Sequence, residues 1–440
     1  MLESFANMFR IPELRKKILF TLGILVVYRL GCLLPVPGVD ITSLNAFFKA
    51  MAEQGSAIAN MLGFAAALSG GALSHSTVFC LGIMPYISAT IIFQLLTGVI
   101  PALERLRKEG ESGLKKIRQY ERYTTFILCL FQGLIYVQWL SGHNIIDPHW
   151  SVRTTAVIVM ATGTMILMWL GDQITQFGVG NGISLIIMAG IVDRLPTGLW
   201  ELFSGLRTGS VSLGTVVFLV VAFVVIVGGV VLITQGQRRI PTQQAKHTRG
   251  RRVYGGQRQY LPFRVNHAGV MPVIFASTLL MFPAMMLQPF ATSPGWAKTI
   301  TDTIFGYGNW PYILMYIILI FFFSYFWTSL MFKPKDLSDN LKDYGSFIPG
   351  IRPGRKTAEY LEYIMIRITL AGAAFLAIIA IIPQLMRTGW QVRVLAGFYG
   401  GTSILIVVGV ALDLVEKIES HLMMRHYEGF MRKGHIRGRR

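Results

Sequence analysis

The sequence predicts an all-α, multi-pass membrane protein whose ten transmembrane helices form two pseudo-symmetric, inverted halves of five. Three observations lead to this fold class: the composition, the uncharged runs along the chain, and a motif that occurs twice. Of the 440 residues, 53% are hydrophobic and only 14% are charged, and the mean hydropathy is +0.52. Because a soluble domain has roughly a quarter of its residues charged, the composition excludes an ordinary soluble protein.

Ten segments of the chain are apolar enough to cross a membrane, which takes about 20 residues each. Residues 54–103 contain no Lys, Arg, Asp or Glu, and this run is too long for a single crossing. Because 60–76 is rich in Gly, Ala and Ser whereas 77–100 is strongly apolar, we expect a short half-helix followed by a full span. The other expected spans are 18–38, 123–142, 154–171, 173–192, 211–233, 268–297, 312–332, 368–386 and 394–412.

The basic residues indicate the orientation in the membrane. With both termini in the cytoplasm, 32 of the 41 Lys and Arg residues fall in cytoplasmic segments and seven fall in the opposite loops. Since basic loops stay on the cytoplasmic side, the net charge of +19 reports topology rather than nucleic-acid binding. Two cytoplasmic loops, 235–267 and 333–363, are longer than topology requires, and long ordered loops tend to carry function. The alternative is that they are solvated loops that only mark topology.

The motif Gly-x-Met-Pro-x-Ile occurs at 82–87 and again at 269–274. The two copies lie in the second and seventh spans, and an offset of five spans reverses their direction across the membrane, as in an inverted repeat. A weaker similarity between "GNGISLII" at 180–187 and "GGTSILIV" at 400–407 has the same offset. The repeats therefore predict an N-terminal half and a C-terminal half with a pathway between them.

The expected halves are 1–200 and 201–440. The kind of pathway between them follows from which ionisable and catalytic groups the spans lack. A coupled transporter needs ionisable groups at mid-membrane, whereas Asp172, Asp193 and Asp413 fall near span ends. A membrane-embedded enzyme needs a catalytic set, but the chain has neither HExxH nor a P-loop, and its eight histidines form no metal-ligand set. The sequence thus favours a passive channel without a cofactor over a solute transporter or an enzyme, with energy supplied by a separate partner.

Isoleucines recur at helical spacing in the four spans that carry the repeats. An apolar constriction blocks ions by dewetting and is indifferent to the chemistry of what passes through it, which suits a polymer with varied side chains. Contact with lipid or with other helices is the ordinary role of such residues, so periodicity alone leaves both interpretations open. The candidates are Ile83, Ile87, Ile183, Ile187, Ile274 and either Ile404 or Ile406.

Several strings in the chain are too specific to follow from membrane composition. They include "LPVPGVD" at 34–40, "GIMPYISATIIFQLL" at 82–96, "KEGESG" at 108–113, "GNGIS" at 180–184, "RVNHAGVMPVIFAS" at 264–277, "FIPGIRPG" at 347–354 and "GGTSILIVV" at 400–408. Through these strings the chain resembles the SecY/Sec61-alpha family, the channel-forming subunits of the Sec protein translocase, over nearly its whole length. The resemblance implies a clamshell in the bacterial cytoplasmic membrane that passes unfolded preproteins and releases transmembrane segments laterally into lipid.

The resemblance also assigns roles to individual residues of the spans. It makes the isoleucines a pore ring of Ile83, Ile87, Ile183, Ile187, Ile274 and Ile406, with Ile404 as the alternative to the last. It makes the second and seventh spans the two sides of a lateral gate. In that gate we expect Pro85 and Pro272 to weaken the two helices. We expect Gln94 and Ser277 to be the polar side chains in the seam between them.

Outside the spans, the resemblance implies a plug, docking loops and partners. The segment 60–76 resembles the plug, and its small side chains bury little apolar area, so displacing it costs little; the candidate residues are Gly63, Ser69, Gly70, Gly71 and Ser74. The two long loops resemble the docking surface for the SecA motor or a ribosome, including rRNA, through Arg238, Arg239, Arg251, Arg252 and Arg352. Pro241 departs from the expected pattern, and we expect it to shorten a hairpin in loop 235–267. Further implied partners are the small subunits SecE and SecG, signal sequences, preproteins and the lipid bilayer.

Overall fold

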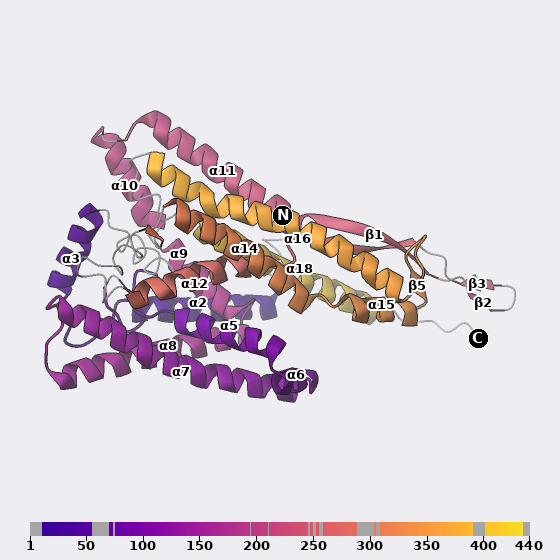
Figure 1. The fold of residues 1–440 in the computed structure, drawn as a ribbon, viewed down its shortest axis with the longest axis horizontal. Helices are drawn as coiled ribbons and strands as arrows, with labels where there is room; N and C mark the ends of the chain where they lie inside the picture. The colour runs from indigo at the N-terminus through magenta and orange to yellow at the C-terminus, as the bar shows by residue number, and fades with distance from the viewer. Residues whose placement is uncertain are drawn as a thin grey trace. The chain divides into compact units, whose positions relative to one another are not determined.

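The computed structural model of this chain consists mainly of helices (Figure 1). It describes residues 11–54, 70–73, 75–193, 195–209, 211–244, 247–249, 252–254, 258–287, 303–304, 309–389 and 401–433.

Ten helices among these residues overlap the ten expected spans. They are α2 (Pro12–Gly31), α5 (Met84–Val99), α7 (Glu111–Gly142), α8 (Trp150–Phe177), α9 (Gly182–Val192), α11 (Leu213–Gln235), α12 (Met271–Leu287), α14 (Trp310–Met331), α16 (Arg355–Gly389) and α18 (Gly401–Lys433). By length and composition alone, six described helices qualify as membrane spans, or seven if a bent pair is counted as one. The count of ten spans therefore stays a prediction. The shorter helices are α3 (Ile41–Gln54), α6 (Pro101–Lys108), α10 (Leu195–Arg207) and α15 (Pro334–Asp343).

The chain falls into two compact units. Unit 1 comprises Met1–Ser210 together with Ile406–Arg440, and unit 2 comprises Val211–Leu405. The helix α18 therefore begins in unit 2 and belongs to unit 1 from Ile406 onward. The expected inverted halves, which divide the chain after residue 200, remain a prediction.

In unit 1, α8 is the central helix. It packs against α2, α7 and α9, and Figure 1 shows it alongside α7. Two glycines of α8 allow a close approach: Gly163 lies against the backbone carbonyl of Val78, and Gly171 lies against the side chain of Ile183. At Gly171 the small residue lets α8 pack against α9 by van der Waals contact, as is typical in a membrane, where burial of apolar surface gives little driving force.

Two ion pairs join neighbouring elements of unit 1. Arg29 in the last turn of α2 lies 2.5 Å from Asp193, which follows α9. Arg122 of α7 lies 2.5 Å from Asp172 of α8. The sequence places these two aspartates near the ends of spans, and it predicts that the Arg29 side chain extends to the membrane–water interface. The structure shows that each has a partner, which lowers the cost of placing a charge near lipid.

A sharp bend at the end of α5 is a feature that the sequence analysis missed. The axes of α5 and α6 differ by 98°. Ile100 has an extended backbone, with φ −94° and ψ 113°, as is typical of a residue before proline. Pro101 then begins α6 at a position where its missing N–H needs no partner. Hydropathy ends the apolar run at residue 100, but it does not show that a polar helix follows there and turns away from α5.

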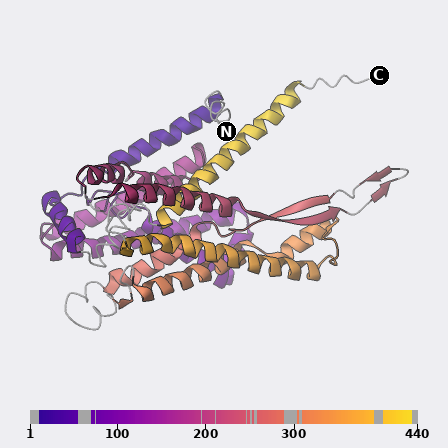
Figure 2. The ribbon, with the colours of Figure 1, turned by 90° about the horizontal axis from the view of Figure 1, so that it is seen from above.

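Unit 2 carries a three-stranded antiparallel sheet in the order β4 (Arg258–Arg264), β1 (Gln237–Gln244), β5 (Ser346–Phe347). A further pair, β2 (His247–Arg249) and β3 (Arg252–Tyr254), lies beyond the ends of β1 and β4 and in line with them (Figures 1 and 2). The described residues of loop 235–267 thus form a two-stranded ribbon of β1 and β4 and the shorter strand pair β2 and β3.

The expectation that Pro241 shortens this hairpin is wrong. β1 runs through Pro241 without a break, and Pro241 is the direct partner of Tyr260 in the register with β4. On its other side β1 pairs with β5 only at Gln243 and Gln244. At Pro241 that side has no partner strand among the described residues, so a residue without an N–H is accommodated there as on an edge strand.

One face of the ribbon rests on a hydrophobic core. Along β1, Ile240 and Thr242 are buried whereas Arg239 and Pro241 are exposed, which is the alternation of a strand with one covered face. The core joins residues of both long loops to α16: Ile240, Phe263, Ile348, Leu361, Ile364, Met365 and Ile368. Loops 235–267 and 333–363 therefore form one body, which we call the cytoplasmic platform in keeping with the predicted orientation.

Candidate channel and docking sites

The repeated motif has the same backbone role in both copies, because each copy begins a helix. α5 begins at Met84 and α12 begins at Met271. Two residues earlier, Gly82 and Gly269 have positive φ angles of +58° and +65°. Glycine adopts this left-handed backbone without the penalty of a Cβ atom, and proline is favoured in the first turn that follows. The motif is thus a turn followed by a helix start.

The expectation that the motif prolines weaken the gate helices is wrong. Pro85 and Pro272 are the second residues of α5 and α12. In the first turn of a helix, proline removes no helical hydrogen bond and causes no kink. Within α12 the internal proline is Pro283, and there a helical hydrogen bond is missing.

The pore-ring candidates are divided between the two units. Ile83 and Ile187 are buried, with 5% and 8% of their surface exposed, and Ile87, Ile183 and Ile274 are half-buried. Ile404 and Ile406 are each 3% exposed, so burial does not choose between them. The ring stays a prediction, with Ile83, Ile87, Ile183, Ile187 and Ile406 in unit 1 and Ile274 in unit 2.

The two polar gate candidates differ in how their side chains are satisfied. The Ser277 hydroxyl donates to the carbonyl of Ile274 at 2.8 Å, so its bond is made within α12. The Oε1 atom of Gln94 is buried and has no hydrogen-bond partner among the described residues. Gln94 is therefore the candidate with an acceptor left for a partner across the predicted seam.

Most of the plug candidates lie outside the described residues, namely Gly63, Ser69 and Ser74. Gly70 and Gly71 are described, and their φ angles are +63° and +82°. They are turn residues, as are most of residues 75–83, so the expected half-helix is wrong for the described residues between 70 and 76. Successive left-handed residues cannot continue a right-handed helix. The full span expected over 77–100 is wrong at its start, because α5 begins only at Met84.

Gly70 is held closely by its surroundings in unit 1. A Cβ atom at this position would lie 2.6 Å from the Tyr28 hydroxyl oxygen and 3.0 Å from the Cα atom of Gly190. The close approach of the Gly70 and Gly190 backbones explains why a small residue is required at position 70. The sequence analysis gave a different reason for small residues here, namely that they make the plug easy to displace.

Two of the candidate docking arginines lie on β1. Arg238 pairs with Phe263 and Arg239 with Pro262, so their side chains project from opposite faces of the ribbon. Both are exposed. Arg252 is on β3, and Arg251 lies outside the described residues.

The register reveals a basic face that the sequence analysis missed. Arg264 pairs with Gln237 and Arg258 pairs with Gln243, which places both arginines on the same face as Arg239. This face is opposite to the buried Ile240. Alternation along the strands is the signal that identifies it, and reading that alternation requires the register.

Arg352 lies on a turn whose base is fixed by two buried hydroxyls. Gly350 and Gly354 frame the turn with φ angles of +84° and +100°. The Ser338 hydroxyl donates to the Gly354 carbonyl at 2.7 Å, and the Thr357 hydroxyl donates to the Arg352 carbonyl at 2.9 Å. The backbone of Arg352 is thus held while its side chain is exposed.

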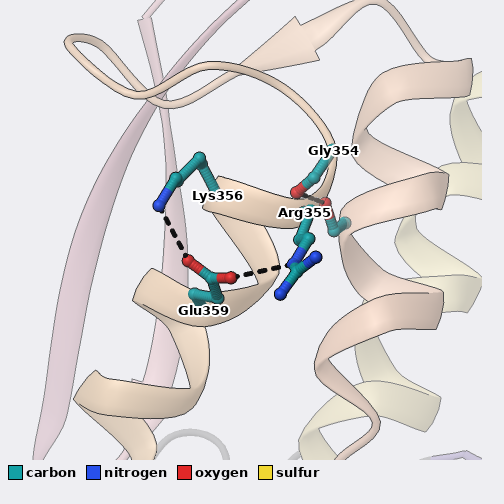
Figure 3. Close-up of polar contacts among 5 residues, drawn as sticks. Gly354, Arg355, Lys356 and Glu359 are labelled. Atoms are coloured by element: carbon teal, nitrogen blue, oxygen red, sulfur yellow. Dashed lines mark hydrogen bonds and ion pairs between the residues drawn. The ribbon is translucent and has the colours of Figure 1, made fainter.

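Beside this turn, Glu359 is shared by two cations (Figure 3). Its carboxylate lies 3.0 Å from Arg355 Nε and 3.2 Å from Lys356 Nζ. These exposed pairs contribute little to stability, but they occupy the two basic residues that follow the turn. The guanidinium of Arg352 has no ion-pair partner among the described residues. An open cavity of about 810 Å³ lies between α15 and the start of α16, next to Gly354.

The string "KEGESG" is explained by a tight junction between α6 and α7. Gly110 precedes α7 with a φ of +79°. A Cβ atom on Gly113 would lie 1.7 Å from the carbonyl oxygen of Leu106, so only glycine allows the two helices to meet.

The string "GNGIS" forms the turn between α8 and α9. The Asn181 side chain accepts hydrogen bonds from the backbone N–H of Ile183 at 3.1 Å and of Ser184 at 3.4 Å, which caps α9. The Gly182 N–H donates to Thr175 Oγ1 at 2.9 Å. The expected span 173–192 is therefore wrong at its start, because α8 extends to Phe177 and α9 begins at Gly182.

His267 precedes the second copy of the motif and packs as an apolar ring. It meets Phe332 edge to face, with ring centroids 6.3 Å apart. Burial, and after it the positive charge of Arg264, lower the pKa of His267 below its ordinary 6.5. Both effects favour the neutral form of the imidazole.

The position of the motif prolines makes a prediction about stability. Pro85→Ala should lower the free energy of unfolding by about 1–2 kcal/mol, through the added freedom of the unfolded chain and the loss of buried ring atoms. Ile92→Pro in the middle of α5 should cost about 3 kcal/mol or more, since it removes a helical hydrogen bond. Thermal melting of the detergent-solubilised protein, followed by circular dichroism, compares the two variants. A marked rise in melting temperature for Pro85→Ala would show that the proline does strain the helix.

Comparison with known proteins agrees with these features. The SecY family model matches residues 77–415. Protein translocase subunit SecY of Streptomyces coelicolor is 47% identical over 445 residues, which cover 98% of this chain and 100% of the relative. The subunit of the same name from Thermotoga maritima is 42% identical over 445 residues, covering all of both chains.

A solved structure of a protein-conducting channel aligns with a TM-score of 0.63 at 18% identity, covering 94% of this chain and 96% of that chain. This likeness confirms the predicted all-α, multi-pass fold class, whereas the count of ten spans and the two inverted halves stay predictions. The identity of 42–47% over full-length relatives confirms the resemblance drawn from the sequence. The chain is a multi-pass protein of the bacterial membrane, and it belongs to the SecY family of protein translocase subunits.

Proposed function

We propose that this chain forms the central pore of a bacterial protein translocase, passing unfolded preproteins across the membrane and releasing transmembrane segments laterally into lipid. The observation that carries this proposal is the identity of 42–47% with translocase subunits over essentially the whole chain. Members of this family are passive channels and not enzymes, so the energy comes from a partner. The motor SecA or a translating ribosome would supply it, and SecE and SecG would complete the complex.

The cytoplasmic platform supports a docking role for the two long loops. Its ribbon and the turn of Arg352 share one hydrophobic core, and β5 of the second loop pairs with β1 of the first. A partner would therefore meet two arginine-bearing elements at a fixed spacing rather than two independent loops. Two of the similar structures are a Sec61 channel from a canine ribosome–channel complex and a yeast Ssh1 complex bound to a ribosome, with TM-scores of 0.59 and 0.60.

The predicted seal yields a test of the pore. Replacing Ile87 and Ile274 together by Asn should raise the resting ion conductance on the order of tenfold, because polar side chains wet an apolar constriction and each 1.4 kcal/mol of lost barrier is tenfold. Preprotein transport should persist. Single-channel recording in planar bilayers measures the leak. The matched control is Ile127→Asn, since Ile127 is an exposed residue of α7 and lies outside the predicted gate. Unchanged conductance in the double variant would remove these residues from the pore.

The fixed turn at Arg352 yields a test of docking. Arg352→Glu should reduce SecA-driven transport into proteoliposomes on the order of tenfold or more, because it reverses a charge at the partner surface. Arg352→Lys should restore only part of the rate, since lysine lacks the planar fork of donors. Lys342→Glu, at the end of α15, makes the same charge change away from the turn. Equal rates for the wild type and Arg352→Glu would reduce the loop to a topology signal.

The proposed lateral gate is tested by crosslinking. Single cysteines placed in 87–95 and in 274–282 should form disulfides across the seam, and the bond should block secretion until it is reduced. Hydrogen bonds between helices in a membrane average only about 0.6 kcal/mol, so the free helices can separate. A disulfide between them should keep the gate closed. The native cysteines should first be replaced by alanine; they are Cys32, Cys80 and Cys129, all free and buried. Normal secretion through a crosslinked channel would contradict the gate assignment.

A further inference from the structure

Tyr136 of α7 binds a segment that leads into α5. Its ring is buried, with 5% of its surface exposed. The phenol oxygen lies 2.6 Å from the hydroxyl oxygen of Ser76, and it donates to the carbonyl of Leu73 at 3.1 Å. Because the single phenol proton goes to Leu73, the Ser76 hydroxyl donates to Tyr136. One buried side chain thus holds two points of the segment.

Ser76 has a backbone conformation that serine rarely adopts. Its φ angle is +41°, and only 1% of its surface is exposed. A residue other than glycine keeps such a conformation only when its surroundings hold it. Three bonds do so: the hydroxyl bond to Tyr136, a bond from the Val36 N–H to the Ser76 carbonyl at 2.9 Å, and a bond from the Ser76 N–H to the Leu73 carbonyl at 3.3 Å.

From Ser76 the chain continues to Ile83 without a helix or a strand. We call residues 75–83 the return segment; they form turns, with one isolated bridge between Thr77 and Pro35. Their backbone groups bond to neighbours instead, including Val78 N–H to the Leu34 carbonyl at 2.9 Å. The carbonyl of Val78 also lies against Gly163 of α8. The path of the return segment is therefore set by tertiary contacts and not by local propensity.

The return segment ends at Ile83, the residue that caps α5. The carbonyl of Ile83 accepts a hydrogen bond from the N–H of Ile87 at 3.0 Å. The position of the first turn of α5 therefore depends on the position of the end of the return segment. A change in the turn at Ser76 shifts Ile83 and the first turn of α5 together. The contact at Tyr136 is thus linked through the return segment to two of the pore-ring candidates, Ile83 and Ile87.

We infer that Tyr136 is a positioning residue for the pore: its hydroxyl holds Ser76 in the left-handed conformation and thereby sets the place of Ile83 at the constriction. This inference rests on the proposed function, in which Ile83 lines the seal. Tyr136 itself need not touch the translocating chain. Its role is to keep the closed constriction tight by holding the segment that begins α5.

The test measures resting ion conductance of the purified translocase complex in planar bilayers. Tyr136→Phe keeps the ring and removes both bonds, and Ser76→Ala removes one of them. Ser76→Ala should raise the conductance about fivefold, the shift in equilibrium that loss of one intramolecular hydrogen bond produces, and Tyr136→Phe, which loses two bonds, should raise it further. Ser76→Gly should leak less than Ser76→Ala, since glycine adopts the left-handed backbone without cost. The double variant Tyr136→Phe with Ser76→Ala should match Tyr136→Phe alone, because both act on the same contact.

Two controls separate this role from general stability and from the pore assignment. Thr125→Val removes a buried hydroxyl of α7 that bonds within its own helix, to the Glu121 carbonyl, and should leave the conductance unchanged. Ile83→Asn should leak by itself. The inference is overturned if Tyr136→Phe changes the melting temperature but not the conductance, or if Ser76→Gly leaks as much as Ser76→Ala. If Ile83→Asn does not leak, the pore assignment of Ile83 fails, and the inference fails with it.

Discussion

The hydrocarbon core of a membrane offers no hydrogen bonds, and most of this structure depends on that constraint. Every backbone N–H and C=O within lipid must find a partner inside the protein, so the apolar stretches of the chain are helical. The return segment 75–83 is apolar but not helical. It is irregular, yet its backbone bonds to the loop that follows α2 and its turn is held by Tyr136. A non-helical path is tolerated there because protein surrounds it.

The same constraint makes helix ends the places where specific residues matter. A helix can stop and restart only if the groups at its ends are satisfied, and the chain meets this need in different ways. Asn181 caps α9 with its side chain. Gly82 and Gly269 turn the chain so that Met-Pro can begin a helix. Pro101 begins α6 after a 98° bend. A few small or polar residues among many apolar ones therefore determine where the helices begin and end.

The cytoplasmic platform follows the rules of a soluble protein instead. Its strands show the alternation of one buried and one exposed face, and its core is built from apolar residues of both loops and of α16. In water, burial of apolar surface drives association, so distant segments fold onto one another. This is why Arg352 and the ribbon arginines belong to a single body. The membrane spans lack this driving force, and there close packing at glycines such as Gly163 and Gly182 takes its place.

The sequence by itself determined the class of protein, the approximate positions of the spans and the family. These follow from hydropathy, charge and rare strings of residues, all of which are local properties. It also identified the twin motif, but assigned its prolines the wrong role. Whether proline bends a helix or begins one depends on where the helix starts, and hydropathy does not mark that point when apolar residues continue across it. The bend after Val99 and the turn before Gly182 were missed because hydropathy and charge do not show where the chain turns between two helices.

Only the tertiary structure decided which side chains meet. The pairing of Arg29 with Asp193, the shared face of Arg239 and Arg264, and the bonds between Tyr136 and Ser76 join residues that are far apart in the chain. No local pattern predicts such contacts, because each depends on the register of strands or on the closeness of helices. A left-handed Ser76 is the clearest case, since its own preference opposes the conformation and only its neighbours hold it.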